Sequence, residues 1–154
     1  MLRFGERLHN LFGEGEMTLW FHPPCAAYKR PESFLQALAE TTVALPERDA
    51  LERAARNNAA QRRLPRIDGA ERASSGQARC RHCREPISKG QWRIRLVFFE
   101  EGFFNASGFV HLGCREAYFG TAEVLEPLLY FSRDLSEQDV GELKQALAAA
   151  PAAR

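Results

Sequence analysis

Two short pairs of cysteine and histidine residues, separated by a long segment, constrain the fold of this chain more than any other feature. Cys80 and Cys83 form a Cys-x-x-Cys pair, and after 27 further residues His111 and Cys114 form a His-x-x-Cys pair. Each spacing lets one tight turn aim two side chains at the same ion. A Cys3His set fills the four positions around tetrahedral zinc and leaves none for water. The sequence therefore predicts a structural zinc site, with Zn2+ as the cofactor that holds a small fold together.

Other uses of these cysteines fit the sequence less well. If these four residues were unrelated core residues, they would have to fall into two such pairs by chance, in a chain with only four cysteines and four histidines. A disulfide framework is disfavoured because there is no signal peptide and no dense cysteine pattern. A thioredoxin-like redox pair needs a following helix, which Pro86 and the strand-like residues after it disfavour. His82 is expected to face solvent and not to bind the metal.

Length and charge limit the remaining possibilities. A chain of 154 residues allows one ordinary domain or two small ones, and small domains usually need a staple such as zinc. Although the formal net charge is +1, residues 53–95 hold eleven Arg and one Lys against three acidic residues. This favours a polyanionic partner over a membrane, while an exposed Arg-rich helix and linker is the alternative explanation. No apolar run approaches the roughly 18 residues of a membrane span.

The chain also contains an internal similarity. His22 and Cys25 form a second His-x-x-Cys pair, and the segment 19–28 around it matches the segment 109–118 around the first. Upstream, residues 2–4 align with residues 92–94 when one residue is gapped. We therefore predict two copies of one module. Because Met1 lies where the segment just after a Cys-x-x-Cys pair should stand, His22 and Cys25 are an incomplete metal half-site.

Three explanations of the half-site stay open. The chain is a truncated or misassigned product of a longer protein, or the first copy has decayed into a metal-free scaffold, or a second chain completes the site. In the chain alone, we predict no tightly bound metal at His22 and Cys25, because two ligands do not make a structural zinc site. Their side chains should still face each other.

Hydrophobic periodicity places the ligands on a hairpin. Residues 92–99 alternate between apolar and polar, as in a strand, and residues 108–111 are the expected return strand. Residues 100–107 between them are predicted to form a loop. Helices broken near Gly120 and Pro127 should follow.

Further helices are expected on both sides of this hairpin. An apolar stripe that includes Val43 predicts a helix ending at Pro46, and residues 48–63 predict a polar connecting helix. Ser136, followed three residues later by Asp139, marks another helix start. Its apolar stripe is expected to pack in the core, with a partner-binding helix as the minor alternative, and residues 148–154 should fray.

Three segments together resemble the PARP-type zinc finger, the DNA-break-sensing module of poly(ADP-ribose) polymerases and DNA ligases. They are residues 73–83 (ASSGQARCRHC), 87–94 (ISKGQWRI) and 111–114 (HLGC). The resemblance covers about residues 67–130. A weaker match, which lacks the segment with the Cys-x-x-Cys pair, covers residues 2–40. It implies an α+β fold, a small zinc-stapled β-hairpin finger with flanking helices, duplicated and with the first copy incomplete.

The corresponding domain organisation has four parts. The predicted domains are 1–45, a truncated copy lacking its Cys-x-x-Cys; 46–66, a basic helical linker; 67–132, the complete finger; and 133–154, a C-terminal helix and tail.

The resemblance also implies how DNA would be held. In that family an arginine on the first strand and a basic residue before the first cysteine hold the backbone, while apolar loop residues stack on exposed bases. Arg93 matches the strand arginine, and Phe103 and Phe104 occupy the predicted loop. Gln77 replaces the family's basic residue, although Arg79 lies close by.

Each of these residues also has a structural alternative. Arg93 could form a surface ion pair with Glu100 or Glu101. The two phenylalanines could belong to a minor core, because phenylalanine is more often buried than displayed. The chemistry of a DNA site agrees with the residues themselves, since arginine suits phosphate and an exposed aromatic ring suits an unpaired base.

The leading functional hypothesis is a zinc-dependent DNA-binding module, largely independent of sequence, that prefers DNA ends, nicks or single-strand junctions. The alternative is a protein-interaction adaptor that keeps the finger as a scaffold and contacts a protein partner through its C-terminal helical region. We expect no enzyme, because no nucleotide loop, Ser-His-Asp set or paired-carboxylate motif is present. The expected location is intracellular: the nucleus in a eukaryote, or the cytoplasm and nucleoid in a bacterium.

Overall fold

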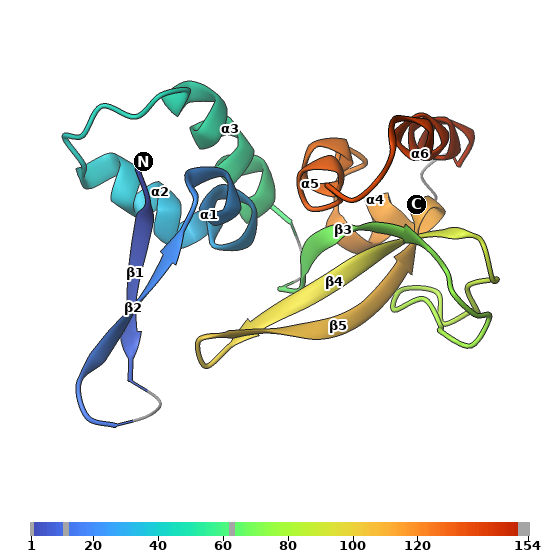
Figure 1. The fold of residues 1–154 in the computed structure, drawn as a ribbon, viewed down its shortest axis with the longest axis horizontal. Coiled ribbons are helices and arrows are strands. Elements are labelled where there is room, and N and C mark those ends of the chain that lie inside the picture. Colours follow the sequence, from blue (N-terminus) through green and yellow to red (C-terminus); the bar gives the residue numbers. More distant parts are fainter. Residues whose placement is uncertain (1, 11–12, 62–63, 151–154) are drawn as a thin grey trace. The chain divides into compact units, whose positions relative to one another are not determined.

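The computed structural model describes residues 2–10, 13–61 and 64–150 (Figure 1). Within these ranges the protein is α+β, with two small antiparallel sheets and six α-helices. The chain divides into two compact units, unit 1 with Met1–Gln61 and Glu100–Phe103, and unit 2 with Arg62–Phe99 and Phe104–Arg154.

None of the helices in the described ranges is long and apolar enough to cross a membrane.

Unit 1 consists of a β-hairpin followed by three helices. Strands β1 (Phe4–His9) and β2 (Glu16–Phe21) pair in antiparallel register, and α1 (Pro23–Lys29), α2 (Pro31–Glu40) and α3 (Arg48–Ala59) follow. Both α1 and α2 begin with proline, whose missing N–H is not needed in the first turn. The helix predicted to reach Pro46 is wrong at its end, because α2 stops at Glu40 and Val43 is 54% exposed.

Unit 1 is held by an apolar cluster and by one carboxylate clamp. Its buried residues are mostly small or aromatic: Ala26, Ala27, Phe34, Leu38 and Ala55. The Glu6 carboxylate on β1 accepts hydrogen bonds from Arg30 Nε (2.8 Å), Arg30 Nη2 (2.7 Å) and Ser33 Oγ (2.8 Å). Burial raises the pKa of Glu6, but these donors and the Arg30 charge outweigh it and hold the pKa below its ordinary value. The clamp therefore ties the hairpin to the start of α2.

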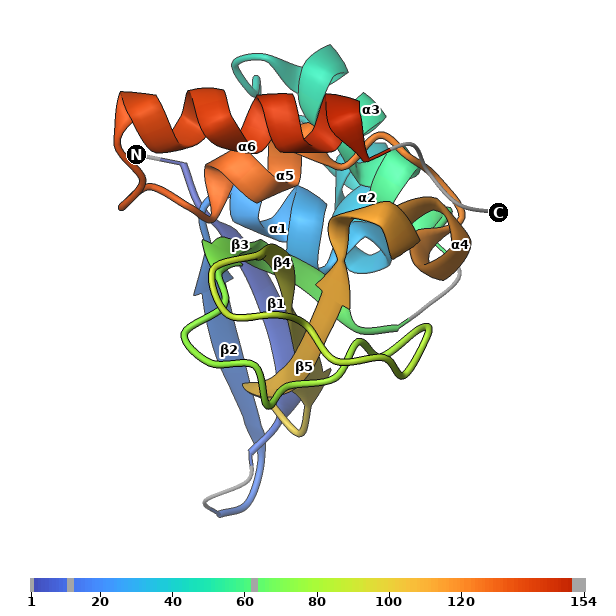
Figure 2. The same ribbon diagram turned by 90° about the vertical axis from the view of Figure 1, so that its right-hand side faces the viewer.

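Unit 2 is built on a three-stranded antiparallel sheet, although residues 100–103, at the tip of one of its hairpins, group with unit 1. The strands β3 (Arg66–Arg72), β4 (Trp92–Glu100) and β5 (Phe103–His111) lie in the order β3-β4-β5. The chain continues as the 3-10 turn η1 (Leu112–Cys114) and the helices α4 (Arg115–Phe119), α5 (Leu125–Tyr130) and α6 (Glu137–Ala149). Helices α5 and α6 lie on the same side of the sheet (Figure 2). Strand β3 was not predicted from the sequence.

The core of unit 2 lies between this sheet and the helices that follow it. Ile94, Val110, Phe119, Leu128 and Leu143 are all fully buried there. Leu143 belongs to α6, so the apolar stripe of that helix packs in the core, as expected. Helix α6 begins at the predicted capping box, because the Ser136 side chain accepts a hydrogen bond from the Asp139 N–H.

The predicted loop over residues 100–107 is wrong. Strand β4 ends at Glu100 and β5 begins at Phe103, so only Glu101 and Gly102 form the turn. Both have positive φ, 51° and 82°, as a two-residue turn of type I′ requires. Phe103 and Phe104 therefore begin a strand and do not lie in a loop.

Two expected helix breaks have different outcomes. Gly120 ends α4 in a left-handed conformation, with φ 84°, which confirms the break there. The break at Pro127 is wrong, because this residue lies in the first turn of α5, where its missing N–H has no helical partner to lose. At the C-terminus, α6 continues to Ala149 and residues 151–154 of the predicted frayed tail lie outside the described ranges.

Candidate metal centre

The two distant pairs predicted to bind metal come together in unit 2. The ligand atoms of Cys80, Cys83, His111 and Cys114 all lie within 4.8 Å of one another. His111 Nδ1 is 3.3 Å from Cys83 Sγ and 3.9 Å from Cys114 Sγ. Three sulfur atoms and one imidazole nitrogen at these separations form a donor set suited to a tetrahedral metal ion such as zinc.

Backbone contacts bring the cysteine turn to the end of the hairpin. Cys80 forms a parallel β-bridge with Phe109, and the Arg81 N–H donates to the Phe109 carbonyl at 2.8 Å. The turn itself closes through a bond from the Arg84 N–H to the Cys80 carbonyl at 3.0 Å, with Arg84 in a left-handed conformation, φ 68°. The site therefore depends on pairing between residues that are distant in sequence.

Hydrogen bonds outside the donor set orient the histidine and one thiol. His111 Nε2 lies 3.2 Å from the Pro86 carbonyl, so this nitrogen carries the proton and Nδ1 directs its lone pair at the sulfurs. The backbone N–H groups of His82 and His111 each donate to Cys80 Sγ at 3.4 Å. The His82 side chain itself is exposed and is not one of the four ligands.

The thiol pKa values show why this cluster suits a cation. Burial raises the pKa of Cys80, but backbone N–H groups of Cys83, His111 and His82 more than compensate and lower it to about 7. Burial and repulsion from the neighbouring Cys80 raise the pKa of Cys114 to about 12. Three thiolates at this spacing repel one another, and a metal ion bound between them removes that repulsion. The cluster can hold a metal ion, and its four protein donors fill a tetrahedral shell.

The other pair, His22 and Cys25, lies in unit 1. His22 Nδ1 lies 3.9 Å from Cys25 Sγ, so the two side chains face each other as predicted. In the described part of the chain, no third histidine, cysteine or carboxylate joins them to make a candidate metal cluster.

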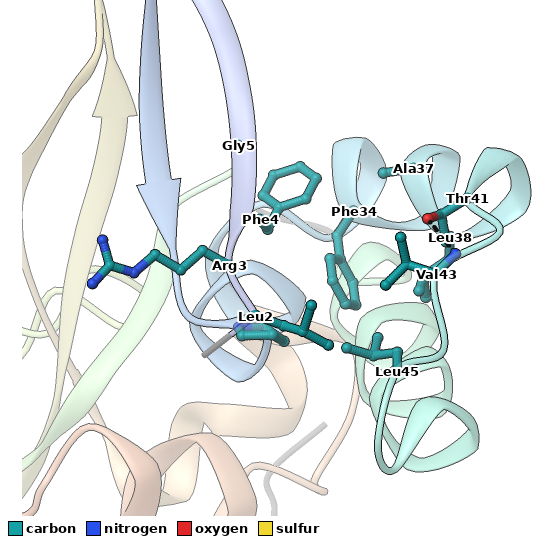
Figure 3. A pocket seen from close by; sticks show the side chains of 11 residues that line it. Leu2, Arg3, Phe4, Gly5, Phe34, Ala37, Leu38, Thr41, Val43 and Leu45 are labelled. Carbon is teal, nitrogen blue, oxygen red and sulfur yellow. Dashed lines mark hydrogen bonds between the residues drawn. The ribbon is translucent and has the colours of Figure 1, made fainter.

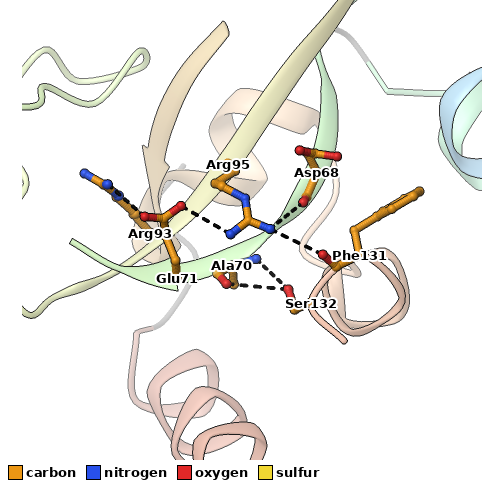
Figure 4. Close-up of polar contacts among 7 residues, drawn as sticks. All are labelled: Asp68, Ala70, Glu71, Arg93, Arg95, Phe131 and Ser132. Atoms are coloured by element: carbon orange, nitrogen blue, oxygen red, sulfur yellow. Dashed lines mark hydrogen bonds and ion pairs between the residues drawn. The ribbon is translucent and has the colours of Figure 1, made fainter. Parts of the chain in front are cut away.

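Arg93, the predicted strand arginine, lies in a partly buried ionic network (Figure 4). Its side chain is 6% exposed, and Nη2 donates to Glu71 Oε2 at 2.9 Å. The guanidinium lies 3.6 Å from the centroid of the Phe109 ring. Arg95 shares the other Glu71 oxygen at 3.2 Å. The ion pair considered from the sequence exists, but with Glu71 and not with Glu100 or Glu101. A phosphate contact by Arg93 stays a prediction.

The remaining predicted DNA contacts are exposed. Phe103 is 51% and Phe104 38% exposed, and the Phe104 ring packs against Phe99 with centroids 4.9 Å apart. Arg79 is exposed and donates from Nη1 to the Arg84 carbonyl at 3.1 Å. None of these three side chains is among the four that form the metal cluster.

A cavity in unit 1 was missed by the sequence reasoning (Figure 3). It has a volume of about 250 Å³ and lies between β1, α2 and the segment that follows α2. Its lining is mainly apolar and includes Leu2, Phe34, Leu38, Val43 and Leu45. The signal in the sequence was the apolar residues that continue past the end of α2.

No protein-family model matches this chain, and a search of curated proteins found no relative. The resemblance to PARP-type fingers therefore stays an expectation drawn from the three sequence segments described above.

Proposed function

We propose that this protein is a zinc-dependent DNA-binding module of the PARP type, which binds largely without regard to sequence and prefers ends, nicks or single-strand junctions. The observation that carries the proposal is an exposed aromatic pair, Phe103 and Phe104, beside the turn of a hairpin whose other end joins a Cys3His cluster. Such rings can stack on an unpaired base, and every base offers a face for stacking.

We further propose that zinc is the metal and that the chain contains two copies of the finger. Three thiolates and an imidazole in a closed set are the ligands of structural zinc sites. In both units a β-hairpin leads directly into a helical turn, with the His-x-x-Cys pair at the junction. His22 has φ −64° and ψ 144°, and His111 has φ −59° and ψ 148°. This agreement supports the duplication.

The proposal is tested by titrating the protein against the same duplex in nicked, blunt-ended and covalently closed forms, at two salt concentrations. Binding should be tightest to the nicked or frayed forms and should weaken steeply with salt. Equal affinity for the closed duplex would contradict the preference for breaks, and the absence of binding to all three would contradict the function.

The aromatic pair gives the sharpest mutational test. Phe103→Ala or Phe104→Ala should cost about 1–3 kcal/mol of binding free energy on nicked DNA and little on closed duplex. Trp20→Ala is the matched control, because Trp20 is an aromatic residue of β2 that is 64% exposed and lies outside the proposed site. If both phenylalanine variants weaken all DNA forms alike, or unfold the finger, the rings are not the break-recognition element.

The role of Arg93 can be assigned by measuring DNA affinity and thermal stability separately. If it contacts a phosphate, Arg93→Ala should weaken binding to all sequences alike and lower the salt slope by about 1. If its role is the ion pair with Glu71, the variant should lower the melting temperature and leave the salt slope unchanged. The two readouts distinguish the roles in one preparation.

A protein-interaction adaptor is the second candidate, favoured by the apolar cavity of unit 1. Leu2 and Val43, on its lining, are 41% and 54% exposed, so an apolar side chain of a partner could contact them. A contact through the C-terminal helix would have to use the face of α6 opposite the buried Leu143. Failure of the DNA titration, with the metal retained, would favour this candidate.

A further inference from the structure

A second cavity lies in unit 2, beside the turn that carries Cys80 and Cys83. It has a volume of about 510 Å³, within the usual range for small-ligand sites. Its lining includes Arg81 and Arg84 from the cysteine turn, Phe98 and Ser107 from the β4–β5 hairpin, and Tyr118 from α4. The cavity therefore combines two cations, a hydroxyl and two aromatic rings.

The two arginines form no ion pair with a described carboxylate, whereas Arg93 and Arg95 share Glu71. The Arg84 side chain has no hydrogen bond to any described group. Two uncompensated guanidinium groups on one cavity attract an anion.

Arg81 is also held in place. Its Nη1 donates to the Ser107 carbonyl at 2.9 Å and lies 3.3 Å from Ser107 Oγ, while Nε and Nη2 bond no described group. Gly108 has φ 91°, and a Cβ there would lie 2.9 Å from Arg81 Cδ. The glycine therefore lets the Arg81 stem cross β5, and the guanidinium keeps donors available at a fixed position.

We propose that this cavity binds a terminal phosphomonoester of a DNA strand together with its end nucleotide, an inference that rests on the proposed function. A phosphomonoester carries nearly two negative charges at neutral pH, which matches two guanidinium groups, whereas an internal phosphodiester carries one. Arginine donates paired hydrogen bonds to such oxygens. Phe98 supplies a partly exposed aromatic ring for the sugar and base, whereas Tyr118 is 4% exposed and belongs to the core.

The test compares one duplex with 5′-phosphate, 3′-phosphate or hydroxyl ends by fluorescence anisotropy. We expect a phosphorylated end, 5′ or 3′, to bind about ten-fold more tightly than a hydroxyl end, as hydrogen bonds to a charged group imply. Arg84→Gln should reduce this ratio to about two-fold or less. Arg81→Gln should reduce it as well. Metal content and circular dichroism check that both variants fold.

Arg133→Gln is the matched control. Arg133 is an exposed arginine of unit 2 that lies over the Tyr130 ring and is not in the cavity lining. This variant removes the same charge, so it should weaken all DNA forms slightly and leave the ratio between phosphorylated and hydroxyl ends unchanged.

The outcomes separate the inference from the proposed function. If hydroxyl-ended and phosphorylated duplexes bind equally well to the wild-type protein, the inference is wrong and the DNA-binding function stands. If no duplex binds, both fail. Binding of a phosphotyrosine peptide in preference to phosphorylated DNA would assign the cavity to a protein ligand and would overturn the inference.

Discussion

The two His-x-x-Cys pairs have similar local geometry, but the residues that surround them differ. His22 and His111 have nearly the same backbone angles, and in each pair the imidazole Nδ1 lies 3.9 Å from the second residue's sulfur. Among the described residues, only the pair in unit 2 meets two further thiols. The short motif therefore sets the geometry of half a site, while a complete metal centre also requires a distant turn that pairs with the hairpin.

The units also differ in what closes them. In unit 1 the Glu6 carboxylate joins the hairpin to the start of α2 through Arg30 and Ser33. In unit 2 the hairpin end is joined to the cysteine turn by the metal cluster and a few backbone bonds. We expect unit 1 to be insensitive to chelation and unit 2 to depend on its metal.

The largest expected effect comes from breaking the complete site. Cys80→Ser should abolish metal binding and unfold residues 74–130, because structural zinc supplies on the order of 10 kcal/mol to the folding of small fingers. Cys25→Ser is the matched control and should keep both metal and fold. Metal analysis with hydrogen exchange of the two units would show the difference. A Cys80→Ser protein with normal exchange protection in unit 2 would contradict the account.

A smaller effect is expected at the ion pair in unit 2. Glu71→Gln should lower the free energy of unfolding by about 3 kcal/mol, because it leaves the buried Arg93 cation without its carboxylate. Glu142→Gln, at an exposed ion pair with Arg72 in the same unit, should cost less than about 1 kcal/mol. Urea denaturation measures both. Equal costs would show that burial of Arg93 does not matter.

The smallest effect is expected at the clamp in unit 1. Glu6→Gln should lower the free energy of unfolding of unit 1 by about 1–2 kcal/mol at neutral pH. Hydrogen exchange of the amides in α1 and α2 measures this change. Because the folded pKa of Glu6 lies below its ordinary value of 4.5, the clamp contributes fully above that value and is lost as pH falls through the folded pKa. The difference between wild type and variant should therefore shrink in acid. Glu52→Gln, at an exposed ion pair on α3, is the control. A stability difference between wild type and Glu6→Gln that stays constant down to low pH would exclude the clamp.

The sequence predicted those features whose signals are local. The ligand spacing identified the four residues that the structure brings together, and Ser136 with Asp139 marked the start of α6. Strand β3 was missed because Arg66–Arg72 is rich in charge and contains Gly69, a pattern untypical of strands. The Glu71 partner of Arg93 was missed with it.

The turn of the second hairpin was missed for a different reason. The turn residues are Glu101 and Gly102, so the sequence lacks the Asn-Gly or Asp-Gly pair that usually indicates a two-residue hairpin turn. Glu101 nevertheless adopts a positive φ, which is uncommon for a residue other than glycine. The unpaired arginines of the cysteine turn could not be separated from the paired ones by sequence, because pairing depends on which strands become neighbours.

The most direct test of the central claim is the metal content of the intact chain by native mass spectrometry, combined with X-ray absorption at the zinc edge. We predict one zinc per chain, with three sulfur ligands and one nitrogen, which Cys25→Ser leaves unchanged and Cys83→Ser removes. Two zinc ions per chain, or a chain without metal whose unit 2 is fully protected from hydrogen exchange, would contradict it.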